Sequence, residues 1–277
     1  MAGRCFMALL FATLFLSQSL YSSDLHNQND TKKNYPLFER DARHFFKTGK
    51  GLLSAPFHFQ KNDWLRAGLF TTGTALLFLA DKPVKQFTQR SQSGFNDVLF
   101  GLDRFRMNYP MFLIGSGIYS WGFLAKNPKT RQTGLMAMEA YVYSGLLSGV
   151  LKIIIGRHRP YHNDNNLLFK PFQAFKDRYQ SLPSGHTITS FAVSTVLAKS
   201  AENICWKMLW YGTAGLMGAA RIYHNRHWLS DVFAGAVLGY FIADYIVKAS
   251  KKGQKEYTGL RSNFYFISNG LQLQIYF

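Results

Sequence analysis

Residues 133–160 read TGLMAMEAYVYSGLLSGVLKIIIGRHRP. Up to residue 156 this stretch is apolar apart from Glu139, Lys152 and a few small polar residues, and it exceeds the ~20 residues that a bilayer-spanning helix needs. Its glycine and serine residues suit close packing between helices. Pro160 disfavours helix at Arg159, so the helix should end there in a polar cluster. The stretch therefore predicts a long, membrane-compatible helix with ionisable groups at its end.

Five further apolar segments resemble this one. With it, they cover residues 67–80, 111–125, 133–156, 188–198, 204–223 and 232–247. Two or three approach the length of a membrane span, and the others are short. We expect an all-α fold, a six-helix transmembrane bundle with the active site at one end. The mean hydropathy of −0.10 is low for six spans, so a soluble helical bundle is the alternative.

The chain of 277 residues has a formal net charge of +17. This surplus suggests an anionic partner, or cations in loops that flank membrane segments. Nucleic acid is not an expected partner, because no nucleic-acid-binding signature appears and the basic residues do not gather on one amphipathic helix. Two cysteines, Cys5 and Cys205, exclude a disulfide framework and a cysteine-based zinc site.

The two ends of the chain differ from its centre. Arg4, the apolar residues 5–16, and Ser17 with Ser19 predict a secretion signal or an N-terminal anchor. A polar arm follows, with a possible amphipathic helix near Phe38 to Leu53. Apolar and polar residues alternate over 271–277, which is typical of a strand. The expected organisation is 1–22 signal or anchor, 23–63 arm, 64–250 helical bundle, and 251–277 basic linker with a short C-terminal β-type tail.

Basic residues mark three connections between the apolar segments. They are Lys126, Lys129 and Arg131, then Lys199 and Lys207, and finally Lys248, Lys251, Lys252 and Lys255. The positive-inside rule makes these regions cytoplasmic, so the opposite ends of the segments face outside. We expect a multi-pass protein of the cell (inner) membrane with its site facing the outside or periplasm. A cleaved signal followed by six full spans would reverse this orientation, so either 67–80 does not span or the leader is not such a signal.

Three short segments place ionisable residues at the ends of apolar helices. In the first, Lys152 and Arg159 are two helical turns apart, and cations so deep in an apolar segment usually face a cavity, although a snorkelling pair is the alternative. In the second, Ser184 and Gly185 open a helix, where free N–H groups bind phosphate well. His186 is placed there to give a proton to a leaving oxygen.

The third segment runs from Arg221 to Asp231. His227 and Asp231 are separated by four residues, so on a helix they would share a face. A carboxylate that holds one ring nitrogen of a histidine leaves the other nitrogen available as a nucleophile. Asp231 as an ordinary helix-start residue is the alternative, and His224 is a rival histidine.

Together the three segments resemble the signature of the type 2 phosphatidic acid phosphatase and vanadium haloperoxidase superfamily, in its membrane lipid-phosphatase branch. The family patterns K-x6-R-P, P-S-G-H and S-R-x5-H-x3-D match in spacing between Lys152 and Asp231. Ala220 is the one departure, because the family usually has serine there. The resemblance extends over about residues 64–248 and leaves out the N-terminal arm and the terminal strand.

The resemblance implies a role for each matching residue. His227 would attack phosphorus and form a phosphohistidine, and Asp231 would orient it. His186 would protonate the leaving alcohol and then activate water. The remaining positions would bind the phosphoryl oxygens: Lys152, Arg159, Ser184, Gly185 and Arg221. Neither a metal nor another cofactor is expected, since fixed cations can stabilise phosphoryl transfer.

The implied enzyme is a metal-independent lipid phosphate phosphatase, a phosphoric monoester hydrolase. Its substrate would be phosphatidic acid, phosphatidylglycerophosphate, a polyprenyl diphosphate or a phosphate of lipid A, and its oligomeric state stays open. Residues 161–180, with Lys170, Lys176 and Arg178, would shape the headgroup entrance. The alternatives are a soluble exported acid phosphatase, a vanadate-dependent haloperoxidase, and a non-catalytic membrane scaffold or lipid-binding protein.

Overall fold

A computed structural model describes residues 36–58, 60–101, 108–162, 165–173, 176–258, 261–267 and 270–276. The predicted signal or anchor, 1–22, lies outside the described residues. The elements in chain order are α2 Leu37–Ser54, the 3-10 turn η2 Ala55–His58, α3 Lys61–Arg90, α4 Gly94–Phe100, α5 Asn108–Leu124, α6 Pro128–Ile155, the 3-10 turn η4 Asp177–Tyr179, α7 Gly185–Ser200, α8 Ile204–Tyr223, α9 Leu229–Thr258, β1 Arg261–Ile267 and β2 Gly270–Tyr276.

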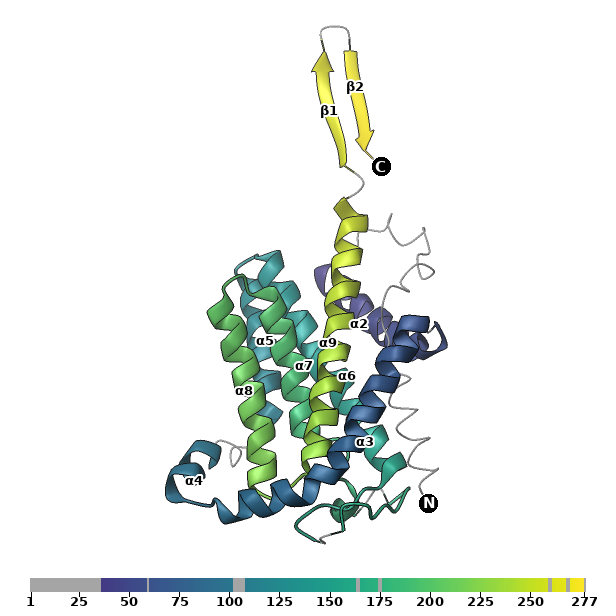
Figure 1. The fold of residues 1–277 in the computed structure, drawn as a ribbon. Coiled ribbons are helices and arrows are strands. Elements are labelled where there is room, and N and C mark those ends of the chain that lie inside the picture. Colours follow the sequence, from purple (N-terminus) through teal and green to yellow (C-terminus); the bar gives the residue numbers. More distant parts are fainter. Residues whose placement is uncertain are drawn as a thin grey trace.

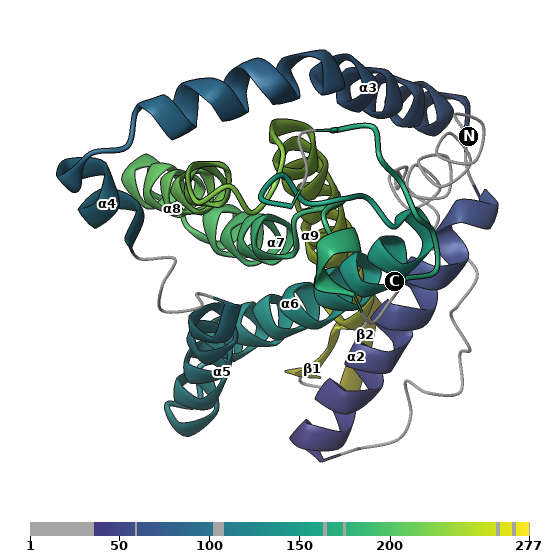
Figure 2. The same ribbon diagram turned by 90° about the horizontal axis from the view of Figure 1, so that it is seen from below.

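Helix α7 is the centre of the bundle. It packs against α6, α8 and α9, while α5 covers α6 and α3 crosses the outside of α9 and α8 (Figures 1 and 2). Its side chains Ile188, Ala192, Val193 and Val196 are fully buried. At Gly239 of α9 an added Cβ would lie 2.3 Å from the Ile188 carbonyl oxygen, so glycine lets the two backbones approach closely. This close packing fixes the start of α9 beside the start of α7.

The all-helical prediction is confirmed for the bundle, because each of the six apolar segments lies within one helix, α3 or α5 to α9, to within one residue at the segment ends. The predicted count of six helices is not confirmed. Within the described residues α2 and α4 are added to those six, and α2 is the amphipathic helix that the arm suggested. Helix α3 also continues past residue 80, through Asp81 and Pro83 to Arg90, because Asp81 is buried in an ion pair rather than exposed at a helix end.

The chain ends in a two-stranded antiparallel hairpin. Arg261 lies opposite Tyr276, and Ile267 lies opposite Gly270. In Figure 1 the hairpin follows directly from the C-terminal end of α9. It lies outside the bundle helices that hold the residues discussed below.

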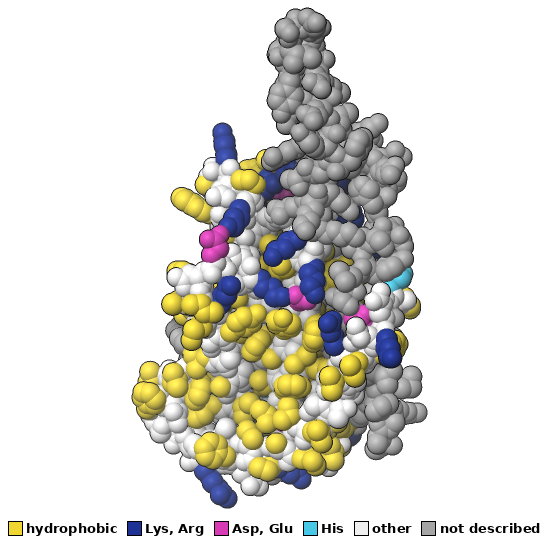
Figure 3. Space-filling view, turned by 45° about the horizontal axis from the view of Figure 1, so that its top comes forward, with side chains coloured by type: hydrophobic (Ala, Val, Ile, Leu, Met, Phe, Trp, Pro, Cys, Tyr) yellow, Lys and Arg dark blue, Asp and Glu magenta, His cyan; other side chains and the backbone are white. Residues whose placement is uncertain are grey.

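The flank of the bundle is apolar. Figure 3 shows hydrophobic side chains over the middle of the molecule, with many Lys and Arg gathered toward the end where α9 terminates. Large hydrophobic side chains are exposed on several helices, among them Leu69 and Leu79 of α3, Leu113 and Trp121 of α5, and Leu146 of α6. Exposed apolar surface of this extent marks a membrane or protein interaction surface. By length and composition, α6 and residues Leu229–Lys251 of α9 are candidate membrane spans among the described residues.

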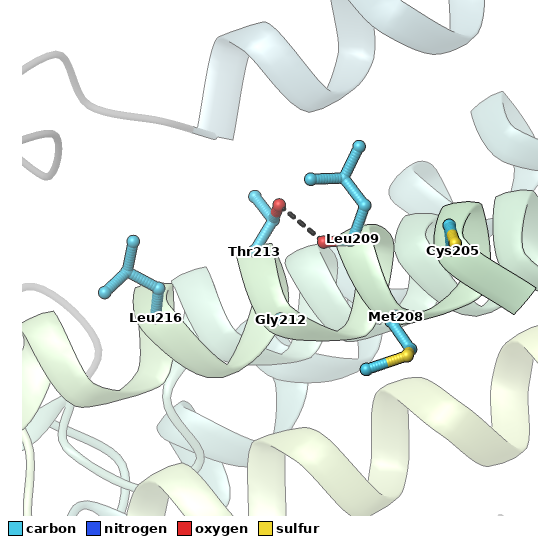
Figure 4. A pocket seen from close by; sticks show the side chains of 6 residues that line it. All are labelled: Cys205, Met208, Leu209, Gly212, Thr213 and Leu216. Atoms are coloured by element: carbon cyan, nitrogen blue, oxygen red, sulfur yellow. Dashed lines mark hydrogen bonds between the residues drawn. The ribbon is translucent and has the colours of Figure 1, made fainter.

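The outer face of α8 illustrates this surface. A shallow apolar groove runs along it (Figure 4), lined by Cys205, Met208, Leu209, Gly212, Thr213 and Leu216. The one hydroxyl in the groove is bonded within the helix, since Thr213 Oγ1 donates to the Leu209 carbonyl at 2.8 Å. A face whose polar atoms are satisfied internally can be covered by hydrocarbon without losing hydrogen bonds.

Candidate active site

The three sequence segments meet at one end of the bundle. Helices α6 and α8 end there, and α7 and α9 begin there (Figure 1). The left-handed conformation of Gly156 (φ 61°) ends α6 and turns the chain. An added Cβ at Gly156 would lie 1.9 Å from the Lys170 carbonyl oxygen, so this turn requires glycine. The turn brings the residues after α6 across the beginning of α7.

His227 lies in the turn before α9 and is 2% exposed. Its Nδ1 is 2.8 Å from the backbone carbonyl oxygen of Ser181. A carbonyl oxygen can only accept a hydrogen bond, so Nδ1 carries the hydrogen and donates it. In the neutral ring, Nε2 then holds the free lone pair. The fold thus fixes the tautomer in which Nε2 is nucleophilic.

Asp231 does not hold His227 in the direct way that the four-residue spacing suggested. Its Oδ2 is 3.8 Å from His227 Nδ1, too far for a hydrogen bond. The reason is that His227 precedes α9, so the two residues are not both on the helix. Asp231 Oδ2 instead accepts the Trp228 backbone N–H at 2.9 Å and the Ser181 hydroxyl. Ser181 therefore links the two side chains, its carbonyl binding His227 and its hydroxyl binding Asp231.

Four positively charged or ionisable side chains act on His227. Burial, and then the charges of Arg159, Arg221, Lys152 and His186, hold the pKa of His227 well below its usual range. The ring is therefore neutral at neutral pH. The same four residues carry the predicted phosphate-binding and proton-donating roles, so the structure brings these residues together around one ring.

Arg159 is buried and follows α6 in the loop that crosses the site. Its Nη2 is 2.9 Å from Asp177 Oδ1, and its Nε donates to the Asp177 carbonyl at 3.0 Å. Tyr161 also donates its hydroxyl to Asp177. Burial opposes ionisation of Asp177, but the Tyr161 hydrogen bond and the Arg159 charge outweigh it and lower the pKa of that carboxyl. This carboxylate holds the guanidinium that was predicted to bind phosphate, and the motif spacing gave no sign of it.

The N-terminus of α7 forms another wall of the site. Ser184 is fully buried, and its backbone N–H donates to the Asp231 carbonyl at 3.0 Å. Gly185 follows, and a Cβ there would lie 3.0 Å from Lys152 Nζ, so glycine leaves room for the ammonium group. His186 is half-buried in the first turn of the helix. An ammonium group beside a helix N-terminus is a suitable place for a phosphate.

The structure also decides between the two candidate histidines. His224 Nε2 lies 3.1 Å from the Phe100 carbonyl oxygen, so that ring faces α4 and not the three motifs. Ala220, at the position where the family usually has serine, is buried near the end of α8. Among the described residues no group of three or more His, Cys, Asp or Glu side chains could hold a metal ion. That no metal takes part stays a prediction.

Sequence reasoning missed a buried ion cluster behind the site. Arg157 and Asp81 are fully buried, and Arg157 Nη1 and Nη2 reach Asp231 Oδ1 at 2.5 Å and Asp81 Oδ2 at 2.6 Å. Charged residues are rarely buried without partners. The Arg157 position inside the first motif could have attracted attention, but Asp81 lies 76 positions away in the sequence and no local pattern connects the two.

A helical bundle with three cations and a tautomer-fixed histidine at one end defines a phosphate-binding class of protein. The family model described as the PAP2 superfamily matches residues 134–255, the part of the chain that contains the three motifs. A lipid A 1-phosphatase of Porphyromonas gingivalis is 40% identical over 77 residues, which are 24% of this chain and 17% of that protein. An undecaprenyl-diphosphatase of Sulfolobus acidocaldarius is 27% identical over 58% of this chain and 81% of its own length.

Solved structures also resemble the chain. One of them is a transmembrane PAP2-type phosphatidylglycerolphosphate phosphatase from Bacillus subtilis, with a TM-score of 0.49 and 20% identity, covering 66% of this chain and 94% of that one. The chain spans less than a fifth of the length of the Porphyromonas gingivalis relative.

Proposed function

We propose that this chain is a metal-independent membrane phosphatase that removes a phosphate group from a lipid phosphate or a polyprenyl diphosphate. One observation carries the proposal: the Ser181 carbonyl fixes the tautomer of the buried His227 ring, and the charges of Lys152, Arg159 and Arg221 act on that ring and lower its pKa. Phosphoryl transfer needs positioned charge more than covalent chemistry from the protein, so this arrangement supplies what the reaction requires.

In the first step the lone pair of His227 Nε2 forms a bond to phosphorus. The bond between phosphorus and the leaving oxygen breaks, and that oxygen takes a proton from the His186 imidazolium. The three cations bind the non-bridging oxygens, together with the amides at the start of α7. A positive charge develops on the His227 ring and is stabilised by the negative charge of Asp231.

In the second step, neutral His186 accepts a proton from a water molecule. The water oxygen bonds to phosphorus, and the bond between phosphorus and Nε2 breaks. Phosphate is released, and the enzyme regains a neutral His227 and a protonated His186. Each proton and electron pair is thereby returned, so the cycle needs no cofactor.

The substrate class rests on the apolar flank and on the relatives. Named relatives include a lipid A 1-phosphatase and an undecaprenyl-diphosphatase, whose substrates combine a phosphate with long hydrocarbon chains. A site at the end of an apolar bundle suits a phosphate at the membrane surface. We therefore place lipid A and polyprenyl diphosphates first among the candidates, before phosphatidic acid and phosphatidylglycerophosphate.

The test is phosphate release by the full-length protein in detergent from a panel of these four lipids, with His227→Ala beside the wild type. His227→Ala should abolish release and also trapping of a labelled phosphoenzyme. His224→Ala is the matched control, because the other histidine faces α4, and it should keep its activity. Full activity of His227→Ala, or a wild type inactive on every lipid, would refute the proposed function.

We also propose a multi-pass arrangement in the cell (inner) membrane, with the site facing the outside. Lys126 and Lys129 flank the turn between α5 and α6, and Lys248 lies near the same end of the bundle. Along α9, Lys248 is 17 residues from Asp231, about 26 Å on a helix, which compares with the ~30 Å hydrocarbon core. The positive-inside rule makes the lysine end cytoplasmic.

Cysteine labelling tests this orientation. In a Cys5→Ser background, Cys205 is exposed at the start of α8 on the lysine end, and Lys176→Cys adds a thiol on the site end. A membrane-impermeant maleimide should label only the added thiol in intact cells, and both thiols after lysis. Labelling of Cys205 alone in intact cells would show the opposite orientation.

A further inference from the structure

We propose that Asp81 and Arg157 are positioning residues of the phosphatase reaction, forming a buried ionic relay from α3 that holds Asp231 beside His227. The inference rests on the proposed function, because it assigns these residues to the same reaction. It adds a contribution from α3, a helix outside the three sequence motifs.

Arg157 connects the components of the relay. Its guanidinium is fully buried and makes five hydrogen bonds. Nη1 donates to Asp231 Oδ1 at 2.5 Å and to Ser230 Oγ at 2.7 Å, and Nη2 donates to Asp81 Oδ2 at 2.6 Å. The remaining bonds go to the Asn166 carbonyl. Each nitrogen of the guanidinium thus donates hydrogen bonds to fixed acceptors, so the group has one orientation.

Asp81 does more than neutralise Arg157. Its Oδ1 accepts the Ser230 backbone N–H at 2.9 Å, and its Oδ2 accepts the Ser230 hydroxyl at 2.8 Å. Ser230 is in the first turn of α9, where backbone N–H groups have no partner within the helix. Asp81 therefore caps α9 from another helix. Because Asp231 is the next residue, this cap also fixes the position of the Asp231 side chain.

Hydrogen bonds fix the position of both carboxylate oxygens of Asp231. Oδ1 accepts from Arg157, and Oδ2 accepts from the Trp228 N–H and the Ser181 hydroxyl. The Ser181 N–H in turn donates to the Arg157 carbonyl at 3.0 Å, so one residue of the relay also holds the loop segment that orients His227. The relay thus reaches His227 along two routes, through Asp231 and through Ser181.

The charges of the cluster support a role in the reaction. The Asp231 carboxylate is buried in this cluster, where solvent screening is weak, and its Oδ2 lies 3.8 Å from His227 Nδ1. That negative charge faces the ring on which positive charge develops during attack. Burying three charged groups is costly, and replacing them by apolar residues is often neutral or stabilising. A requirement for the position and charge of Asp231 explains why α3 carries a buried carboxylate at Asp81.

The experiment measures kcat and KM of Asp81→Asn on the panel lipid that the wild type hydrolyses fastest, with a ³²P label. Loss of second-layer support typically costs about 10- to 100-fold in activity, so we expect kcat to fall by that factor while KM changes by less than about threefold. Asp63→Asn is the matched control. Asp63 is an equally buried carboxylate at the other end of α3, where it accepts the Gln60 N–H, and its loss should leave kcat per folded molecule unchanged.

A double variant separates a positioning role of Asp81 from a purely structural role. If Asp81 acts through Asp231, adding Asp81→Asn to Asp231→Asn should lower kcat by less than about threefold further, because the interaction is already lost. The ³²P label keeps turnover measurable in the slow Asp231→Asn background. An equal loss in both backgrounds, or a loss no greater than that of Asp63→Asn, would overturn the inference. A His227→Ala enzyme that stays active would instead remove the proposed function itself.

Discussion

Replacing Asp231 by asparagine tests how the site activates His227. The carboxylate is fully buried, and its Oδ2 lies 3.8 Å from His227 Nδ1 without a direct hydrogen bond. With an effective dielectric constant of about 20, two unit charges at this separation interact by about 4 kcal/mol. The ring carries only part of a full charge in the transition state, so we expect kcat to fall by about two to three decades.

The assay is steady-state phosphate release by the purified full-length protein, together with a thermal unfolding curve for each variant. Asp244→Asn is the control, because Asp244 is a partly buried carboxylate on the same helix that pairs with Lys199 and Lys248. It lies 13 residues further along α9, about 20 Å from Asp231. The control should keep its turnover. A loss of less than about tenfold in Asp231→Asn would contradict the reasoning, since the geometry would then not place its charge where the reaction needs it.

Two more predictions concern the charge around His227 and the turn after α6. Arg221 lowers the pKa of His227, so Arg221→Gln should raise that pKa and move the acid limb of kcat/KM to higher pH; measured on one substrate, an unmoved limb would contradict this. Gly156→Ala should lower the unfolding temperature in detergent, because φ at this position is 61° and the new Cβ would meet the Lys170 carbonyl. Gly149→Ala is the control within α6: its Cβ would meet no atom within 4 Å, so it should stabilise the protein by up to about 1 kcal/mol.

The local part of the site could be predicted from the sequence because each motif is short. Lys152 and Arg159 share one segment, as do Ser184, Gly185 and His186, and each segment lies at the end of an apolar helix that hydropathy reveals. The convergence of these helix ends followed from the resemblance to a family. The structure then places the side chains around one histidine, which spacing alone cannot do.

The contacts across the fold could not be predicted. Asp81 and Arg157 meet because α3 crosses the end of the bundle, and a single sequence contains no signal for pairing residues 76 positions apart. The apolar segment stops at residue 80, before Asp81, and hydropathy gives no sign that the helix continues to Arg90. The helix continues because Arg157 neutralises the carboxylate. In the sequence, a buried charge whose partner is distant therefore looks like the end of an apolar helix.

The absence of a direct hydrogen bond between Asp231 and His227 has a physical cause of the same kind. A spacing of four residues predicts a shared face only if both residues are helical. His227 lies in the preceding turn, where its Nδ1 finds the Ser181 carbonyl. A backbone carbonyl can only accept a hydrogen bond, so it fixes the tautomer that carries the hydrogen on Nδ1. Asp231 is then left with an electrostatic task, and its accurate placement depends on Arg157 and on the cap that Asp81 gives to α9.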